Sequence, residues 1–169
     1  VLVSRPAELD RGLPHAGLGD VFDKVLEQVL PALSPPRRRA LEVALLFEDV
    51  TRGSDPRTLG VAVRSALEAL AAKTPVVLAV DDVQWLDPPS ARILEYVLRR
   101  SSDVPLRVLL ARRPDPENPL PLGLDRAPPA LAVERVAVPP MDVGELDELL
   151  RSSLVLALPR PRLVELRRI

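Results

Sequence analysis

The chain alternates between segments whose apolar residues recur at helical spacing and short runs that are apolar almost throughout. Residues 75–80 and 106–111 form two such runs, which predict strands buried on both faces of a sheet. Residues 1–3 and 131–138 are two further strand candidates. Strand and helix patterns in alternation are typical of a parallel α/β sheet with right-handed crossovers.

Several helices are predicted by the residues that begin them. Ser34, Asp55 and Asp87 each precede a proline, and a capping side chain followed by proline suits the first turn of a helix. Asp142 and Glu145 have the spacing of a capping box. The predicted helices cover residues 19–33, 34–48, 55–73, 87–98 and 142–150, and a last one runs from about residue 159 to the end of the sequence.

The composition fits one globular domain and excludes several kinds of chemistry. A length of 169 residues is typical of a single domain. The 23 basic and 24 acidic residues leave a net charge of −1, so there is no general attraction to nucleic acid or to an anionic membrane. The lack of cysteine excludes disulfides and thiol nucleophiles. No apolar run approaches the length of a membrane span and no signal peptide is present, so a cytoplasmic location is expected.

The segment richest in chemistry follows the predicted strand at 75–80. Asp81 and Asp82 come directly after it, and in open α/β sheets ligands bind beyond the carboxyl ends of the strands. Two carboxylates at that place are costly unless they face water, a cation or hydrogen-bond donors. The alternative is that both acids only end the strand and accept hydrogen bonds from loop amides.

A longer pattern around these acids is more specific. After Asp81 and Asp82 come Trp85, Asp87 and Ser90, in an order that resembles the Walker B segment of the STAND branch of AAA+-like ATPases. In particular it resembles the ATPase domain of large LuxR-type (LAL-type) transcriptional regulators. The resemblance implies a three-layer, parallel-sheet P-loop NTPase-like core. It also implies that Asp81 binds Mg²⁺ on ATP and that Asp82 orients the attacking water or the sensor network.

Two other segments carry the same resemblance. Residues 35–45 are similar to a helix start that these regulators have between Walker A and Walker B. Residues 108–111, followed by Arg112 and Arg113, resemble the sensor 1 strand, whose final arginine reaches the γ-phosphate. By alignment with that strand ending, Arg113 is favoured over Arg112. The alternative is an exposed strand end with two solvated arginines.

The sequence departs from the family in one large respect. It contains no G-x-x-x-x-G-K-[ST] phosphate loop, and neither Lys24 nor Lys73 follows a glycine. The resemblance implies that this loop and the first strand precede Val1, and that the lid and a DNA-binding helix-turn-helix follow Ile169. We therefore expect a partial ATPase core over 1–158 and the start of a helical lid segment over 159–169. The remaining strands should leave an unpaired gap, so the chain should be less stable than its length suggests.

The function implied by the resemblance is an ATP-binding regulatory switch. Its ligands are ATP or ADP with Mg²⁺, and DNA is reached only through a module outside this chain. Without a phosphate loop we expect little or no ATP binding by the chain alone, and ATPase activity and self-association are left open. The alternative is a degenerate α/β interaction module with no nucleotide chemistry.

Three other features have simpler interpretations. His15, the sole histidine, has no partner group nearby in sequence that favours a general base. Trp85 is favoured as a packing anchor over a ligand contact. Arg37, Arg38 and Arg39 are favoured as the solvated face of a helix over a phosphate or partner contact.

Overall fold

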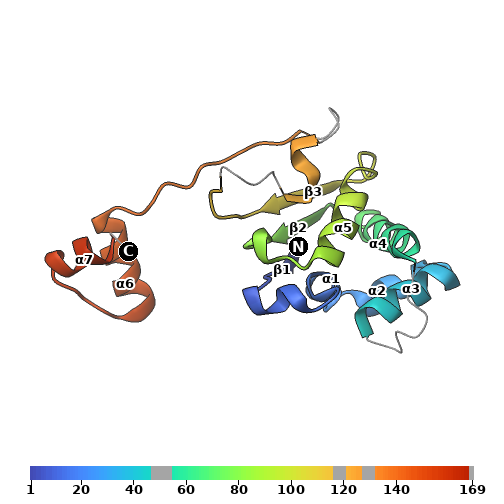
Figure 1. Ribbon diagram of the computed structural model, residues 1–169, viewed down its shortest axis with the longest axis horizontal. Coiled ribbons are helices and arrows are strands. Elements are labelled where there is room, and N and C mark those ends of the chain that lie inside the picture. Colours follow the sequence, from blue (N-terminus) through green and yellow to red (C-terminus); the bar gives the residue numbers. More distant parts are fainter. Residues whose placement is uncertain (47–54, 116–120, 127–131, 168–169) are drawn as a thin grey trace. The chain divides into compact units, whose positions relative to one another are not determined.

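The computed structural model describes residues 1–46, 55–115, 121–126 and 132–167 (Figure 1). The chain falls into two compact units, Val1–Val133 and Glu134–Ile169. The first unit holds a parallel sheet with its helices, and the described part of the second holds two helices.

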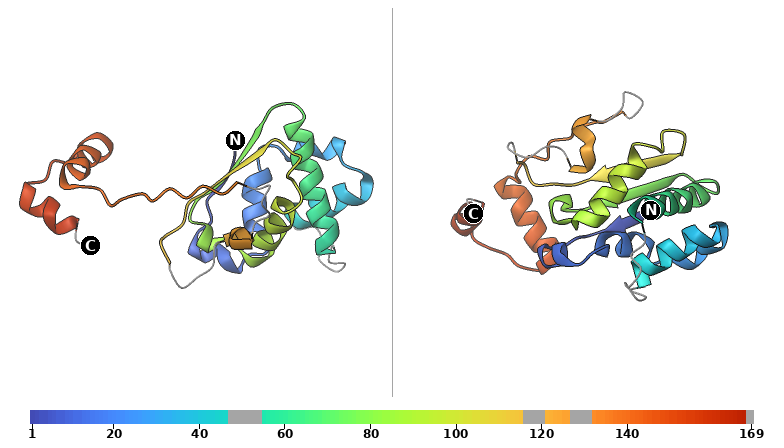
Figure 2. Two further views of the ribbon diagram at one scale, coloured as in Figure 1. Left: turned by 90° about the horizontal axis from the view of Figure 1, so that it is seen from above. Right: turned by 45° about the vertical axis from the view of Figure 1, so that its right-hand side comes forward.

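In the described residues, the sheet of the first unit has three parallel strands in the order β1-β2-β3. These are β1 (Leu2–Ser4), β2 (Val76–Val80) and β3 (Leu106–Leu110), which confirms the strands predicted at 75–80 and 106–111. The chain crosses from β1 to β2 through α1 (Ala16–Phe22), α2 (Leu26–Val29), α3 (Pro35–Leu46) and α4 (Pro56–Ala71), and from β2 to β3 through α5 (Pro88–Leu98). Figure 2 gives two further views of these strands and helices.

The core lies between the sheet and the layer formed by the helices α1 to α5. Along β2, Val76, Leu78 and Val80 are buried, whereas the alternate residues are only half-buried. Leu78 is paired in register with Leu2 and with Val108, so these three share the face that the helices cover. The core is completed by fully buried side chains of the helices, among them Phe22, Leu18, Leu41, Leu59, Leu67 and Leu94. Burying side chains of this size contributes about 1.5–3 kcal/mol each.

The opposite face of the sheet is more open than the sequence predicts. Val3, Ala79 and Leu109 lie in one row across it, and the Leu109 residue is 66% exposed. The expected burial of β3 on both faces is therefore wrong for the described residues of the first unit, in which the helices cover one face of the sheet. The third layer of the expected core stays a prediction. The reason is topological: successive right-handed crossovers that advance in one direction across a sheet place all their helices on one face.

The strand expected at 131–138 is absent from the described part of that range. Residues 132–138 are exposed and belong to no strand, and Leu131 lies outside the described residues. Val136 and Val138 are 78% and 89% exposed. A strand requires a neighbouring backbone to satisfy its N–H and C=O groups, and the apolar pattern alone does not supply one.

The helix predicted over 19–33 is divided. It forms α1 and α2, followed by a 3-10 turn at Leu30–Ala32. Val25 interrupts the helix with φ −127° and ψ −1°, and Pro31 has no N–H to continue an α-helix. The helices predicted from Ser34, Asp55 and Asp87 begin at the next residue in each case, although the part of the first one beyond Leu46 lies outside the described residues.

The second unit contains α6 (Val143–Leu154) and α7 (Arg160–Leu166). The capping box is confirmed, because Asp142 accepts hydrogen bonds from the Gly144 and Glu145 N–H groups while Glu145 accepts one from the Asp142 N–H. The last helix begins where predicted but ends at Leu166. The boundary expected between 158 and 159 stays a prediction. None of the helices in the described ranges is both long and apolar enough to span a lipid bilayer.

Candidate functional site

The carboxyl ends of the three strands meet at one edge of the sheet because the strands are parallel. The Asp81 N–H donates to the Ser4 carbonyl at 3.0 Å, and the Val83 N–H donates to the Ala111 carbonyl at 3.0 Å. These hydrogen bonds continue the strand ladders past the last paired residues. They bring the chain after β2 into contact with the ends of both neighbouring strands.

Asp81 and Asp82 occupy the centre of this edge. The Asp82 N–H donates to Oδ1 of Asp81 at 3.0 Å, and the Asp82 backbone is left-handed, with φ 42° and ψ 49°. That conformation is uncommon outside glycine, although Asp adopts it more readily than most residues. A 3-10 turn at Val83–Trp85 follows. The turn leaves Asp81 exposed and the Asp82 side chain 45% exposed, so both charges remain hydrated.

A glutamine joins these acids to the chain after β3. Gln84 Nε2 donates to Asp82 Oδ1 at 2.7 Å, and Gln84 Oε1 accepts from the Arg113 N–H at 3.4 Å. The Arg113 Nε lies 3.9 Å from the same Asp82 Oδ1. The sequence reasoning missed Gln84. The available signal was a side-chain amide between two apolar residues, directly after the paired acids.

The two arginines after β3 have different surroundings. Arg112 Nη2 donates to the Asp115 carbonyl at 2.7 Å. The Arg113 side chain is 76% exposed and forms its ion pair with Asp82. The structure thus places the favoured Arg113 beside an acid of the candidate site. Its role as a phosphate sensor stays a prediction.

Asp87 does more than cap the helix that it precedes. It is only 2% exposed, and its carboxylate accepts hydrogen bonds from the N–H groups of Ser90 at 2.9 Å, His15 at 2.9 Å and Gly17 at 3.0 Å. Ser90 Oγ accepts a fourth bond, from the Leu18 N–H at 3.0 Å. One carboxylate therefore satisfies the amino ends of α5 and α1 together, which positions the loop after β2 on the helical layer.

His15 takes part in this cluster through its backbone. Its φ of 65° is left-handed, and Nδ1 of its ring is buried with no hydrogen-bond partner among the described residues. Burial lowers the pKa of His15, Asp87 raises it and Arg92 lowers it further. The ring is therefore protonated less readily than a free imidazole, and no contact among the described residues marks it as a general base.

The two acids at the edge fit a magnesium ion that is held mainly by other ligands. In the described ranges, no group of three or more acidic or histidine side chains could form a metal cage. Oδ1 of each acid accepts a hydrogen bond from the chain, and no such bond to either Oδ2 is found among these residues. Mg²⁺ on a nucleotide is commonly bound by one or two carboxylates together with water and phosphate oxygens. Asp81 and Asp82 therefore suit a Mg²⁺ ion that is bound to a nucleotide, and they do not form an enclosed metal site made of protein ligands.

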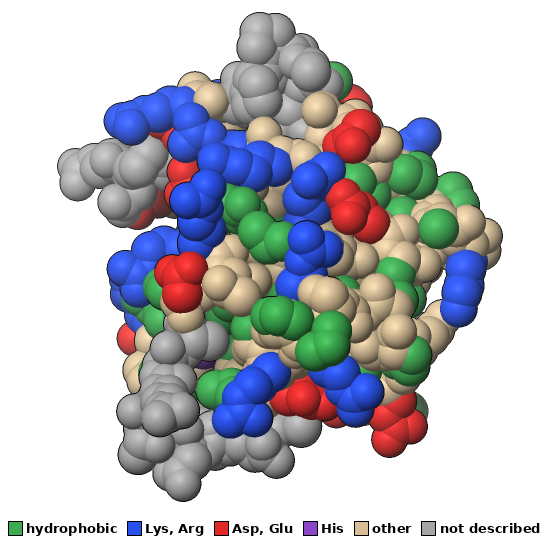
Figure 3. Space-filling model, turned by 90° about the vertical axis from the view of Figure 1, so that its right-hand side faces the viewer, with side chains coloured by type: hydrophobic (Ala, Val, Ile, Leu, Met, Phe, Trp, Pro, Cys, Tyr) green, Lys and Arg blue, Asp and Glu red, His purple; other side chains and the backbone are tan. Residues whose placement is uncertain are grey.

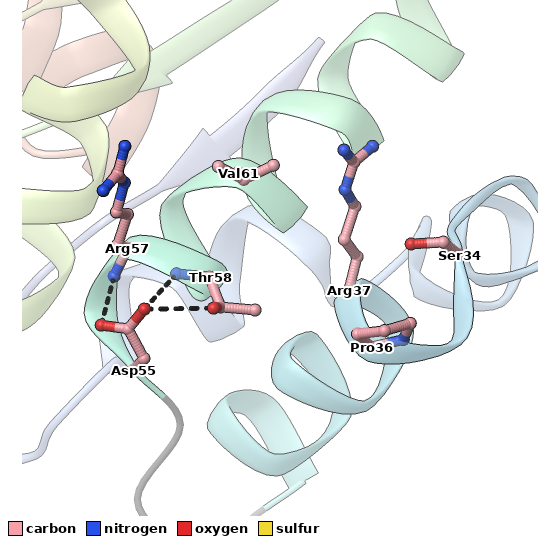
Figure 4. A pocket seen from close by; sticks show the side chains of 7 residues that line it. All are labelled: Ser34, Pro36, Arg37, Asp55, Arg57, Thr58 and Val61. Carbon is pink, nitrogen blue, oxygen red and sulfur yellow. Dashed lines mark hydrogen bonds between the residues drawn. The ribbon is translucent and has the colours of Figure 1, made fainter.

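A hollow of about 320 Å³ lies elsewhere, where α3 and α4 begin (Figure 4). It is lined by Ser34, Pro36, Arg37, Asp55, Arg57, Thr58 and Val61. Asp55 caps α4 by accepting from the N–H groups of Arg57 and Thr58, and the Arg37 side chain donates to Ser65 Oγ. The polar side chains that line the hollow thus cap α4 and join α3 to α4. Neither Asp81 nor Asp82 lines the hollow.

Basic side chains are spread over the face shown in Figure 3, with acidic side chains among them. Arg38 pairs with Glu42 at 2.9 Å one turn along α3, and Arg64 of α4 pairs with Glu68 at 2.9 Å and with Asp103 at 3.3 Å. Residues 37–39 are all exposed. These contacts agree with the solvated helix face favoured for Arg37, Arg38 and Arg39.

Comparison with known families identifies the domain. A family model described as the AAA ATPase domain matches residues 1–111, about two thirds of the chain. Searches of curated proteins and of solved structures found no match. The mixed α/β unit with its three-stranded parallel sheet is consistent with the P-loop NTPase-like core expected of that family. The chain belongs to the AAA ATPase domain family.

Proposed function

We propose that this chain is part of the ATP-binding regulatory switch domain of a LuxR-type transcriptional regulator of the STAND branch. The family indicates nucleotide binding. The observation that carries the nucleotide switch is the meeting of Asp81, Asp82 and Arg113 at the carboxyl edge of a parallel sheet, and the resemblance of the segment from Asp81 to Ser90 carries the LuxR-type and STAND part. That edge is where open α/β sheets bind their ligands.

In this proposal each of the three residues has a separate role. Asp81 holds Mg²⁺ on the nucleotide, mainly through water, and the ion offsets charge on the phosphates. Asp82 orients the attacking water or the sensor network through its free oxygen. Arg113 leaves Asp82 and contacts the γ-phosphate. Residues 1–158 belong to the ATPase core and 159–169 to the helical segment after it, and DNA is bound by a module outside this chain.

The reading frame upstream of Val1 gives the cheapest test. A strand followed by G-x-x-x-x-G-K-[ST] shortly before Val1 supports the switch domain, because the backbone of that loop binds the phosphates. A start codon without such a loop supports the degenerate interaction module. In the second case the chain alone binds no ATP and the acids have no nucleotide role.

ATP titration of the 169-residue chain tests the expected dependence on the phosphate loop. The chain alone should show no saturable binding by calorimetry, because nothing in the sequence supplies the loop lysine and its backbone cradle. Micromolar affinity for ATP would contradict this expectation. It would show that the sheet edge holds phosphate by other groups.

A further inference from the structure

Among the contacts described above, Gln84 is the one uncharged side chain that connects Asp82, after β2, with Arg113, after β3. Its carboxamide has one donor end and one acceptor end. The donor end lies 2.7 Å from Asp82 Oδ1 and the acceptor end lies 3.4 Å from the Arg113 nitrogen. The reverse orientation of the carboxamide would place its oxygen against the Asp82 carboxylate and its N–H₂ against the Arg113 N–H. The hydrogen bond to Asp82 and the one from Arg113 therefore both require the same orientation of the Gln84 amide.

This bridge holds Asp82 in a defined orientation. Oδ1 is engaged by Gln84 and lies 3.9 Å from Arg113 Nε, while Oδ2 has no hydrogen bond from the described residues. The left-handed Asp82 backbone allows the side chain to fold back toward Gln84, two residues ahead. A charge-assisted hydrogen bond of 2.7 Å is short, and such bonds are stronger than neutral ones. The exposed ion pair at 3.9 Å contributes little by comparison.

We propose that Gln84 is a positioning residue that couples the carboxylate of Asp82 to the chain after β3. When Arg113 moves away from Asp82, its N–H withdraws from Gln84 Oε1 and the amide no longer fixes Asp82 Oδ1. The reorientation of Asp82 and the displacement of Arg113 are therefore one event. For the intact protein the inference rests on the proposed function. There, a γ-phosphate that binds Arg113 also changes the orientation of Asp82.

Two substitutions separate the halves of the bridge. Gln84→Met keeps the length of the side chain and removes both hydrogen bonds. Gln84→Glu keeps an acceptor for the Arg113 N–H but replaces the donor by a carboxylate that repels Asp82. Gln28→Met is the matched control, because Gln28 is exposed on α2 and distant in sequence from the bridge.

Nuclear magnetic resonance on the 169-residue chain reads the coupling without nucleotide. Gln84→Met should shift the backbone amide resonances of both Asp82 and Arg113. It should also accelerate exchange of the Arg113 amide by up to about five-fold, the factor for losing one ordinary hydrogen bond, because the bond to Gln84 is long at 3.4 Å. Gln84→Glu should shift Asp82 and leave Arg113 exchange near that of the wild type. Gln28→Met should change neither. Unchanged Asp82 and Arg113 resonances in Gln84→Met would overturn the proposal.

Hydrolysis by the intact protein gives the second readout. Gln84→Met should lower kcat about ten-fold with KM for ATP unchanged, as expected for a group that orients a reacting residue. It should cause no further loss when Asp82→Asn is already present. A full additional loss in that background would overturn the coupling. If the intact wild-type protein neither binds nor hydrolyses ATP, the proposed function fails, and the resonance measurements still decide whether Gln84 couples the two elements.

Discussion

Asp87→Ala removes a carboxylate that caps two helices at once. Three backbone N–H groups, of His15, Gly17 and Ser90, then lose their acceptor in a place where Asp87 is only 2% exposed. A buried N–H without a partner costs about 1–3 kcal/mol. Removing the desolvated charge recovers part of that cost, so we expect the free energy of unfolding to fall by roughly 3–5 kcal/mol.

Urea denaturation followed by circular dichroism measures this loss. With a slope of about 2 kcal/mol per molar urea, the midpoint should fall by about 1.5–2.5 M. Asp55→Ala is the matched control, because Asp55 caps α4 by accepting from the N–H groups of Arg57 and Thr58 at the surface. That substitution should cost about 1 kcal/mol.

Asp87→Asn should lie between the wild type and Asp87→Ala. An amide oxygen at the position of Oδ1 still accepts from His15 and Ser90, whereas the amide nitrogen faces the Gly17 N–H with no acceptor. If Asp87→Ala costs no more than Asp55→Ala, the reasoning that one buried carboxylate holds α1 and α5 together is refuted.

Five further substitutions test the packing and the electrostatics of the core. Gly17→Ala should lower the free energy of unfolding by about 1–3 kcal/mol, because its new methyl would overlap the Leu86 side chain. Gly19→Ala on the same helix meets open space and should raise the free energy of unfolding by about 0.5–1 kcal/mol. Urea unfolding measures both changes. The lowered pKa of His15 means that the unfolded chain binds a proton first, so the free energy of unfolding should decrease as the pH falls below about 6.5. His15→Asn should flatten that slope, measured by urea midpoints across this range, and an identical slope in both proteins would exclude His15 as its source. Leu78→Ala, at a fully buried position, should cost about 2–5 kcal/mol, whereas Leu109→Lys, at a position 66% exposed, should change stability by less than about 0.5 kcal/mol. A large loss for Leu109→Lys would show that the open face of the sheet is covered in solution.

The elements that the sequence predicts well are those whose signals are local. The strand β2 follows from a continuous apolar run, and α4, α5 and α6 follow from Asp55, Asp87 and Asp142 at their starts. Each of these signals is contained within a few neighbouring residues. Local chemistry is enough to begin a helix, whatever packs on it later.

The features that the sequence could not supply depend on distant partners. Residues 132–138 have a strand-like pattern but no neighbouring strand among the described residues, so they remain exposed. The second role of Asp87 depends on residues about seventy positions away in the chain. At the site, Asp81, Asp82 and Arg113 could be selected from the resemblance to the family's Walker B and sensor 1 segments, whereas Gln84 became visible only when β3 brought Arg113 beside it.

The most direct test of the account is Mg²⁺-dependent ATP hydrolysis by the intact protein with Asp81→Ala. Asp103→Ala is the control, because Asp103 is an exposed acid that pairs with Arg64 before β3, at the opposite end of that strand. The account predicts that Asp81→Ala abolishes Mg²⁺-dependent hydrolysis while Asp103→Ala leaves it at the wild-type rate. Hydrolysis that continues unchanged in Asp81→Ala would contradict the claim that this edge of the sheet is the nucleotide site.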